Sequence, residues 1–374
     1  MKIGILTHPL RFNYGGILQN FALQHVLKSL GHEVYTIDWN DDKSFVYMVL
    51  SYVKRVFSRY VLGKKHIPTN FYINLTRKQF LDINENNQKF IDKNINKTEY
   101  ISSISNLSRV NRMHFDAIVV GSDQVWLEQF VPTMYLDFLN QDILRIAYAA
   151  SFGKSEWTYN KKNTDIAKLL VKKFKAISVR EESAVELCER YLNVSATWVL
   201  DPTLLLTAKQ YNQVLDASND FTPKTPYLFT YILDDSPIKR KISNQVKEKK
   251  CLSVYEMSTR ESSETGRQKV PSVYSWLYGI KNASFVVTDS FHGMVFSIIY
   301  NRPFLVIGNE ERGMARFFSL LNMLKLQNRM ILVNNVDIDQ IIEDLKDINY
   351  EEVNALLENA KINSNDFIYK FLRK

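Results

Sequence analysis

The amino-acid sequence predicts an α/β protein with two Rossmann-like, doubly wound domains that face each other across a cleft. Short apolar runs alternate with amphipathic helical patterns along most of the chain, which is the order of βαβ units in a parallel sheet. The length of 374 residues exceeds what one hydrophobic core usually serves, so the pattern is divided between two domains. Ligands of such proteins bind beyond the carboxyl ends of the strands.

The first half opens with a βαβ unit. KIGILTH predicts a buried parallel strand, and the apolar spacing of ILQNFALQHVLKSLGHEV predicts a helix that stops at Gly31. EVYTIDW predicts the second strand. Further strands are predicted in FDAIVVG, ILRIAYAASFG, AISVREE and ATWVLDPTLLL, and helices in KKNTDIAKLLVKKF and ESAVELCERYL. Residues 1–206 therefore form the predicted N-terminal domain.

Residues from about 41 to 112 interrupt this pattern with a charged, aromatic, Asn- and Lys-rich insertion. Within it, residues 44–66 combine an apolar face with several Lys and Arg residues. Such a helix either packs on the domain with a basic outer face or lies on an anionic membrane surface.

The second half repeats the alternation of strands and helices. Strands are predicted in YLFTYIL, CLSVYEM, SFVVTDS, PFLVIG and RMILVNN. Pro202 and Thr207 mark the boundary, so residues 207–348 form the predicted C-terminal domain. Residues 349–374 are expected to be a helical segment that packs back on the N-terminal domain.

Composition limits the functional classes. The net charge of +8 suits a solubilising surface or an acidic partner, but zinc-finger spacing and RNA-binding aromatic signatures are missing, so nucleic acid is not expected. Two distant cysteines indicate a reducing cytosol, and no apolar run reaches the roughly 18 residues of a membrane span. The string Asp337-Ile338-Asp339 precedes a helix and is explained by capping, so no metal site is predicted.

Two loops of the second half and one of the first carry cationic side chains beyond predicted strands. His292 follows FVVTDS and precedes a glycine and a helix, where an imidazole can donate a proton. Arg180 lies one step beyond a buried strand and can grip a carboxylate or phosphate, or pair with a neighbouring glutamate. Arg312 and Arg316 offer further anion ligands or surface ion pairs.

The remaining strand-end loops lie in the first half. In NYGG, Gly15 can help to present backbone N–H groups to an anion or can simply permit a tight turn. Asn13 and Tyr14 can bind a sugar hydroxyl or cap the helix. Ser122 and Asp123 either cap the following segment or line the cleft.

Four stretches, in order, resemble the polysaccharide pyruvyl transferase family. They are NYGGILQNFALQHVLKSLGHEV, FDAIVVGSDQVW, ISVREESAVELCERY with VLDPTLLL, and FVVTDSFHGMVFSIIYNRPFLVIGNEERGMARF. The resemblance implies a fold similar to GT-B glycosyltransferases and the transfer of pyruvate from phosphoenolpyruvate onto a sugar as a cyclic ketal. It implies no cofactor beyond phosphoenolpyruvate as co-substrate, and no metal.

The resemblance also implies roles for residues. The family's catalytic histidine corresponds to His292 and its phosphoenolpyruvate-binding arginine to Arg180. Family members often carry arginine two residues before that histidine, where this chain has Ser290, so this donor anchor is either missing or supplied elsewhere, by Arg312 or Arg316. The implied donor-binding residues are Arg180, Ser290, Phe291, Gly293, Arg312 and Arg316, and the implied acceptor-binding residues are Asn13, Tyr14, Gly15, Ser122 and Asp123.

The acceptor implied by the resemblance is a galactose or N-acetylmannosamine residue of a capsule, an exopolysaccharide or another cell-surface glycan. Its precursor is expected on a polyprenyl diphosphate lipid, met by a cytoplasmic enzyme that contacts the inner face of the membrane through residues 44–66. One alternative is a nucleotide-sugar glycosyltransferase on the same fold, which the Ser290 departure keeps open. Another is a glycan- or lipid-binding module without catalysis.

Overall fold

The computed structural model describes residues 1–42, 81–215, 225–257, 269–308, 313–332 and 338–372. The predicted interfacial helix over residues 44–66 lies outside the described residues, and so do Arg312 and Asp337. The described ranges include residues of every strand that the sequence predicts.

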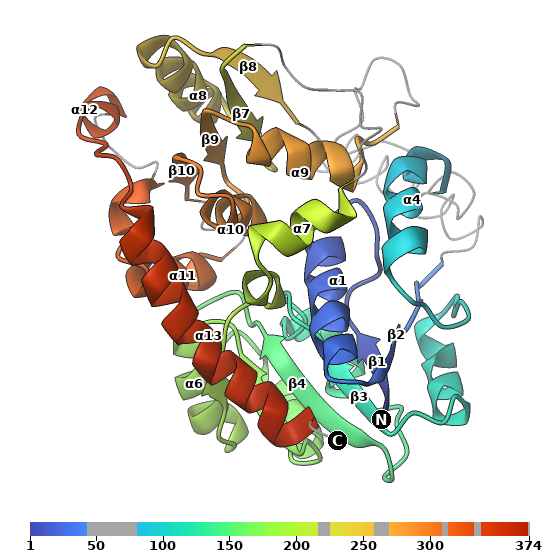
Figure 1. Cartoon of the computed structure of the whole chain (residues 1–374). Coiled ribbons are helices and arrows are strands. Elements are labelled where there is room, and N and C mark those ends of the chain that lie inside the picture. The colour runs from blue at the N-terminus through green and yellow to red at the C-terminus, as the bar shows by residue number, and fades with distance from the viewer. Residues whose placement is uncertain (43–80, 216–224, 258–268, 309–312, 333–337, 373–374) are drawn as a thin grey trace, which may run out of the picture.

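The strands form two sheets, one in each half of the chain (Figure 1). The first sheet consists of β1 (Lys2–Leu6), β2 (Glu33–Thr36), β3 (Ala117–Val120), β4 (Leu144–Ala150), β5 (Ala176–Val179) and β6 (Thr197–Trp198). The second consists of β7 (Tyr227–Tyr231), β8 (Ser253–Glu256), β9 (Phe285–Thr288), β10 (Phe304–Ile307) and β11 (Met330–Ile331). Every pairing between these strands is parallel. The predicted α/β class with two doubly wound units is confirmed.

Helices cover the sheets, which explains why the central strands consist mostly of apolar residues. β3, β9 and β10 are buried along their whole length. The helices are α1 (Tyr14–Ser29), α4 (Glu85–Asn94), α5 (Lys161–Val171), α6 (Ser183–Leu187), α7 (Ala208–Val214), α8 (Pro237–Lys249), α9 (Val273–Lys281), α10 (Phe291–Ile299), α11 (Ala315–Met323), α12 (Ile338–Glu343) and α13 (Tyr350–Leu372). Shorter turns are the 3-10 helices η2 (Ile104–Arg112), η3 (Glu128–Phe130), η4 (Thr133–Tyr135), η6 (Pro202–Leu205) and η8 (Gln327–Arg329), and the π-helical turn η5 (Cys188–Leu192).

The helix predicted to stop at Gly31 does so. Gly31 has a φ of 82° and its N–H donates to the carbonyl of Lys28 at 2.9 Å, a helix end that favours glycine. This short connection returns the chain to β2 beside β1.

Each sheet has one point where the strand order reverses. The first sheet runs β2-β1-β3-β4-β5-β6, so β2 and β3 flank β1, and the second runs β11-β10-β9-β7-β8, so β8 and β9 flank β7. Doubly wound proteins bind ligands in the crevice at this switch point. The loops that leave β1 and β3 carry His8 and Asp123, and the loop that leaves β9 leads to His292.

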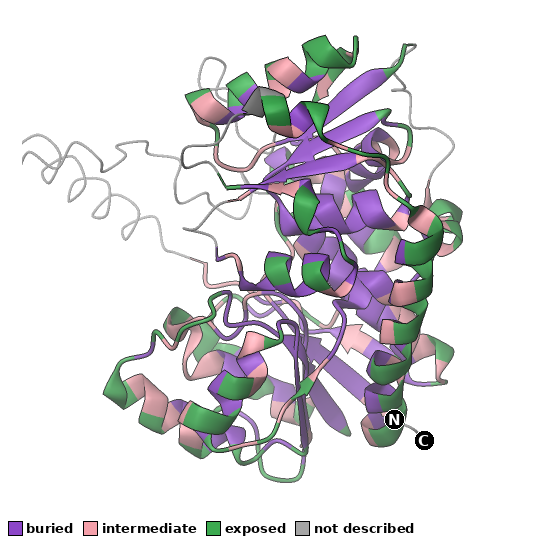
Figure 2. Ribbon diagram, turned by 90° about the vertical axis from the view of Figure 1, so that its left-hand side faces the viewer, coloured by how far each residue is buried: buried purple, intermediate pink, exposed green. Residues whose placement is uncertain are grey.

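One hydrophobic cluster joins the two halves. It contains Tyr14 and Phe21 of α1, Tyr211 of α7, Trp276 of α9 and Phe296 of α10. The ring centroids of Tyr14 and Trp276 lie 5.6 Å apart, and those of Tyr211 and Phe296 lie 4.8 Å apart. Figure 2 shows buried residues running from one sheet, through the helices between, to the other.

The long C-terminal helix α13 runs across both halves (Figure 1). Its first part places Val353 and Leu357 in the cluster that joins the halves. Further along, Ser364 Oγ accepts a hydrogen bond from the N–H of Leu200 at 2.9 Å, and Phe367 packs on Tyr148 of β4. The second half of α13 therefore packs against the first sheet.

Candidate active site

Five ionisable side chains from both halves meet near the two switch points. They are termed the charged cluster, and they are Asp123, Arg180, Asp201, His292 and Arg316. The exposed fractions of these side chains lie between 0% and 9%. Charges buried to this extent are strongly unfavourable unless opposite charges face them, and here the two carboxylates face three cationic or protonatable groups.

Arg180 is the centre of the cluster because it contacts both carboxylates. Its Nη1 lies 2.8 Å from Asp201 Oδ2 and its Nη2 lies 3.6 Å from Asp123 Oδ1. Ser122 Oγ lies between, since it accepts from Arg180 Nη1 at 3.3 Å and donates to Asp201 Oδ2 at 2.8 Å. Burial alone would lower the pKa of Arg180, but Asp201, Asp123 and Glu181 raise it above its ordinary value. The guanidinium is a fixed cation.

His292 enters the cluster from the first turn of α10. Its Nε2 lies 3.6 Å from Asp201 Oδ2, within ion-pair range but beyond hydrogen-bond distance. Burial would raise the pKa of Asp201, but His292, Arg180 and Thr203 together hold it well below its ordinary value. Asp201 is therefore ionised and can stabilise an imidazolium beside it.

Gly15 explains how His292 reaches this position. The imidazole packs directly on the backbone of α1, and a Cβ at residue 15 would overlap its Nδ1. The sequence left two roles open for Gly15, which were presenting backbone N–H groups to an anion and permitting a tight turn. The structure shows a third role. The glycine admits a side chain from the other half of the protein.

Asp123 has a backbone conformation that is unusual for a residue with a side chain. Its φ is 101°, a region whose occupation costs about 1–3 kcal/mol and is concentrated at functional sites. The conformation is held by hydrogen bonds to its carbonyl from the N–H groups of Val125 at 2.7 Å and Ser151 at 3.1 Å. It directs the carboxylate to Arg180, to Arg316 Nη1 at 4.0 Å and to Asn13 Nδ2 at 3.3 Å. Burial would raise the pKa of Asp123, but Arg180, His8, His292 and Arg316 lower it.

The residues around His292 that the family resemblance implied as donor ligands have clear structural positions. Ser290 caps α10, because its Oγ accepts from the N–H of Gly293 at 3.3 Å. Gly293 is required where the helix passes Thr288, whose Oγ1 would overlap a Cβ. Two guanidinium groups lie over the Phe291 ring. The Cζ atom of Arg180 is 4.8 Å and that of Arg316 is 5.5 Å from the ring centroid.

Arg316 reaches the charged cluster that also contains His292. Of the two candidates expected to replace the family arginine at Ser290, Arg312 lies outside the described residues, whereas Arg316 joins the charged cluster from α11.

Three of the residues expected to bind the acceptor are enclosed. Tyr14 has no exposed surface, and its hydroxyl donates to the carbonyl of Pro271 at 2.7 Å. Gly15 and Ser122 are also buried, under His292 and within the charged cluster. These residues hold the site together and offer a sugar no surface in this conformation. Asn13 is exposed, caps α1 by accepting from Gly16 N–H at 3.1 Å, and touches Asp123.

Two residues of the site were missed in the sequence. Asp201 lay inside the segment ATWVLDPTLLL that was predicted as a strand, although it follows β6, and its Oδ1 accepts from Thr203 N–H at 3.0 Å. His8 follows β1, and its ring packs on that of Phe130 with centroids 4.6 Å apart. His8 is the last residue of the predicted strand KIGILTH, and a polar side chain at the end of a strand is a signal that could have found it.

Asp289, beside the histidine in the sequence, has a different task. It accepts from the N–H groups of Leu233 at 2.6 Å and Asp234 at 3.1 Å, and from Lys239 Nζ at 2.7 Å. It therefore ties the loop after β7 to the loop after β9 at the second switch point.

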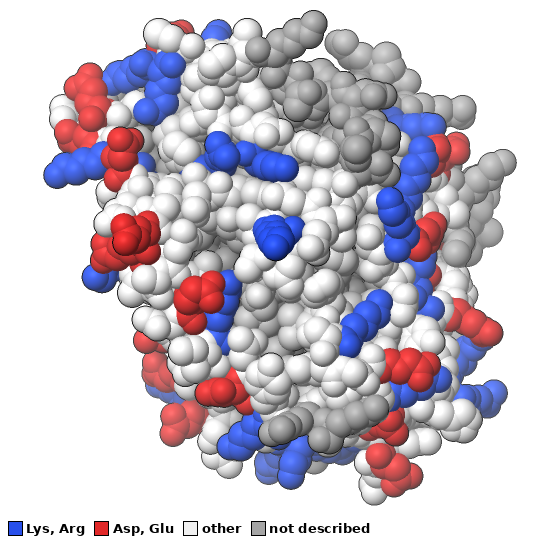
Figure 3. All heavy atoms as spheres, viewed as in Figure 1, with Lys and Arg blue, Asp and Glu red and all other residues white. Residues whose placement is uncertain are grey.

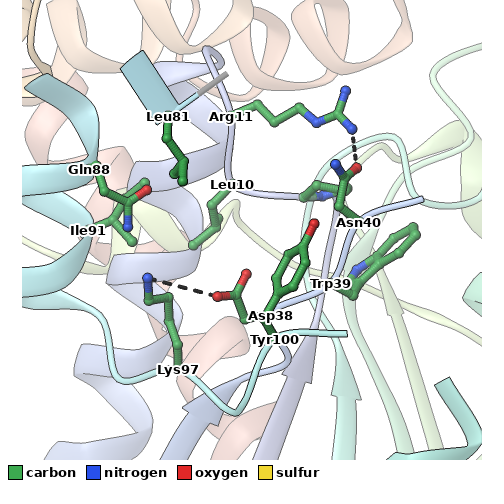
Figure 4. Close-up of a pocket in the computed structure, with 11 residues that line it drawn as sticks. Leu10, Arg11, Asp38, Trp39, Asn40, Leu81, Gln88, Ile91, Lys97 and Tyr100 are labelled. Carbon is green, nitrogen blue, oxygen red and sulfur yellow. Dashed lines mark hydrogen bonds and ion pairs between the residues drawn. The ribbon is translucent and has the colours of Figure 1, made fainter. Parts of the chain in front are cut away.

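A hollow opens beside the first switch point (Figure 4). Its walls come from the loop after β1, the segment after β2 and α4, and the residues are Pro9, Leu10, Arg11, Asp38, Trp39, Asn40, Leu81, Gln88, Ile91, Lys97 and Tyr100. Arg11 contacts Asn40 across it, and Lys97 Nζ lies 3.9 Å from Asp38 Oδ2. The loop that carries His8 thus continues into a wall with aromatic and hydrogen-bonding groups.

Two further properties bear on function. Within the described part of the chain, no group of three or more His, Cys, Asp or Glu residues is placed to hold a metal ion. No described helix has the length and apolarity needed to cross a membrane.

Comparison with known proteins identifies a family and a fold. A model of the family described as polysaccharide pyruvyl transferase matches residues 13–311. No curated protein matches the sequence.

Solved structures of similar fold include Arabidopsis thaliana UGT89C1 complexed with UDP-L-rhamnose, at 12% identity and a TM-score of 0.55, covering 99% of this chain and 98% of the other. The UDP-GlcNAc 2-epimerase from Neisseria meningitidis bound to UDP-GlcNAc has 14% identity and a TM-score of 0.53, with 100% of both chains covered. S. aureus MnaA with UDP has 13% identity and a TM-score of 0.53, covering 99% and 97%. At these identities the likeness concerns the fold, two Rossmann-like domains of the GT-B kind.

Proposed function

The chain belongs to the polysaccharide pyruvyl transferase family, and from this premise we propose that it transfers pyruvate from phosphoenolpyruvate onto two hydroxyls of a sugar. The product is a cyclic ketal. The observation that supports this most is the meeting of His292, Arg180 and Arg316 in one buried cluster supplied by both halves.

The two arginines suit a donor with two anionic groups. Phosphoenolpyruvate carries a carboxylate and a phosphate, and guanidinium groups bind both with paired hydrogen bonds. Arg180 Nη2 and Arg316 Nη1 lie 3.6 and 4.0 Å from Asp123 Oδ1, longer than hydrogen bonds. A donor anion can therefore replace Asp123 as the partner of these two groups.

His292 is the acid of the proposed reaction. Its imidazolium protonates C3 of the enol phosphate, which makes C2 electrophilic, and a sugar hydroxyl adds to C2. Phosphate then leaves, with its charge offset by the arginines, and the second hydroxyl closes the ketal. Asp201 stabilises the imidazolium before the proton is given up. General acid catalysis of this kind contributes about 10²–10⁴-fold.

The acceptor proposed is a galactose or N-acetylmannosamine residue of a cell-surface glycan, carried on polyprenyl diphosphate at the inner face of the membrane. The net charge of +8 suits a cytoplasmic enzyme that meets an anionic lipid surface. On the face in Figure 3, positive and negative side chains are intermixed along the edges. The proposed membrane contact is made by residues 44–66, which lie outside the described residues.

The proposal is tested by measuring phosphate release from phosphoenolpyruvate with a panel of lipid-linked acceptors. Wild type should release phosphate only with an acceptor, and mass spectrometry should find the pyruvylated product. His292→Ala should lower turnover by about 10²–10⁴-fold.

The matched control is His114→Ala, which should leave turnover unchanged. His114 precedes the amino end of β3, whereas the charged cluster lies beyond the carboxyl ends of the strands. Turnover of a nucleotide sugar, with no acceptor-dependent phosphate release, would instead assign the chain to the glycosyltransferase alternative.

A further inference from the structure

The proposed reaction moves protons in two directions. His292 gives one proton to C3 of the donor, while the two attacking hydroxyls each lose one. One hydroxyl proton restores His292 over the cycle, and the other leaves with phosphate. The attacking hydroxyl loses its proton as the oxygen adds to C2, so a second proton-accepting group beside the acceptor assists this step.

The carboxylates of the cluster are poor candidates for this task. Asp201 and Asp123 are each paired with cations, and the pKa of each lies below its ordinary value, so neither holds a proton readily. Glu181 has no exposed surface, and its Oε1 already accepts from Ser151 Oγ and from the N–H groups of Phe152 and Gly153 at 2.8–3.0 Å.

His8 lies at the same crevice and is partly exposed. The parallel register places Leu6 beside Val120, and Thr7 Oγ1 donates to the carbonyl of Ser122 at 3.2 Å. Residue 8 therefore lies beside the Ser122–Asp123 turn at the first switch point. His8 from the first half and His292 from the second both lower the pKa of the same carboxylate, Asp123.

The surroundings of His8 suit a positioned base. Its ring rests on Phe130, with centroids 4.6 Å apart and an interplanar angle of 54°, which restricts its orientation. The next residues along the chain, Pro9, Leu10 and Arg11, form one wall of the hollow in Figure 4. A polar molecule that binds in this hollow would contact the loop that carries His8.

We propose that His8 is the base that takes the proton of the attacking sugar hydroxyl, and that the acceptor approaches over the wall formed by Pro9–Arg11. The inference rests on the proposed function. The O–H bond breaks, its proton moves to a ring nitrogen of His8, and the oxygen electron pair forms the bond to C2. After phosphate departs, taking one proton, the second hydroxyl adds in the same way. The remaining proton returns to His292 through the solvent, so each turnover ends with both imidazoles in their starting states.

The test uses His8→Gly and His8→Gln in the full chain. Both variants should lower acceptor-dependent phosphate release by about 10²–10⁴-fold. Imidazole added to His8→Gly should restore a measurable part of the turnover, because the deleted side chain leaves room for it. Phosphoenolpyruvate should still raise the melting temperature of both variants as it does that of wild type, because the donor site is intact.

The control is His114→Gly, at a position whose φ of 54° glycine adopts without strain. It should keep wild-type turnover and show no response to imidazole.

Wild-type turnover in His8→Gln would overturn the inference, and so would a loss in both variants that imidazole does not restore. In either case an active wild type leaves the proposed function standing. A wild type that releases no phosphate with any acceptor counts against the proposed function itself, and the role of His8 falls with it.

Discussion

At the scale of single residues, the site depends on a contact between a glycine and a histidine from opposite halves. Gly15 leaves no atom between the backbone of α1 and the imidazole of His292. The same histidine faces Asp201 with its other nitrogen, so its position is fixed from two sides.

Gly15→Ala should therefore displace His292 and lower turnover strongly. Its Cβ would overlap the imidazole, whereas at Gly16 the nearest atoms to an added Cβ are 3.2–3.5 Å away and belong to the flexible side chain of Asn13. Gly16→Ala is the matched control, and it should retain most of the activity. Equal turnover in Gly15→Ala and wild type would show that the contact with His292 is not needed.

The sequence located His292, Arg180 and Asp123 because each stands where a predicted strand ends, and parallel strands end at one edge of a sheet. The role of Asp201 was not visible in the same way. It depends on α10 of the second half crossing to the end of β6, and no local pattern reports that contact. The need for glycine at residue 15 has the same origin.

At the scale of elements, α11 is docked on the first half through the ends of β4 and β5. The N–H of Glu182 donates to Ser319 Oγ at 3.0 Å, and the carbonyl of Gly153 fills the place of a Cβ at Gly313. Glu181 holds the Gly153 loop by accepting from its N–H at 3.0 Å. Arg316 reaches the charged cluster from the first turn of this helix.

Glu181→Gln should gain stability relative to wild type as pH rises. Burial raises the pKa of Glu181 and Arg180 only partly offsets it. The folded protein therefore keeps a proton that the unfolded chain releases above its ordinary value of about 4.3, and stability falls as pH rises through the folded pKa. Glutamine has no proton to lose and can still accept from the Gly153 loop.

Urea unfolding at several pH values between about 4 and 8 measures this difference, with the exposed Glu182→Gln as control. A difference that stays constant over the range would mean that Glu181 is ionised in the folded protein. If the stability of Glu181→Gln relative to wild type increases with pH, wild-type Glu181 keeps its proton in the folded protein.

The elements themselves were largely predictable. Every predicted apolar run contains a strand, and the inner strands were the clearest because strands covered on both faces are mostly apolar. The docking of α11 was not, because it joins backbone atoms of two glycines that are remote in the chain. The insertion from about 41 to 112 carried only a weak helical pattern, and α4 within it was not located.

At the scale of the whole molecule, the halves share one core and α13 closes it. The helix buries Val353 and Leu357 in the joining cluster, and Phe367, Ile368 and Leu372 against the first sheet. Because both halves depend on these contacts, they should unfold together.

Phe367→Ala should lower the free energy of unfolding by about 3–5 kcal/mol in a single transition. Its side chain is buried beside Tyr148, whereas Tyr369 two residues on is 49% exposed. Tyr369→Ala is the control and should change stability by less than about 0.5 kcal/mol. Two separate transitions in urea would contradict the shared core.

The span of the joining cluster, from Tyr14 to Leu357, has a consequence for synthesis. The ribosome releases Tyr14 of α1 long before it makes Pro271 and Trp276, the residues that Tyr14 contacts in the second half. Until then this part of the α1 surface stays uncovered, and transiently exposed apolar surface favours aggregation. The charged cluster likewise is complete only after Arg316 has been made.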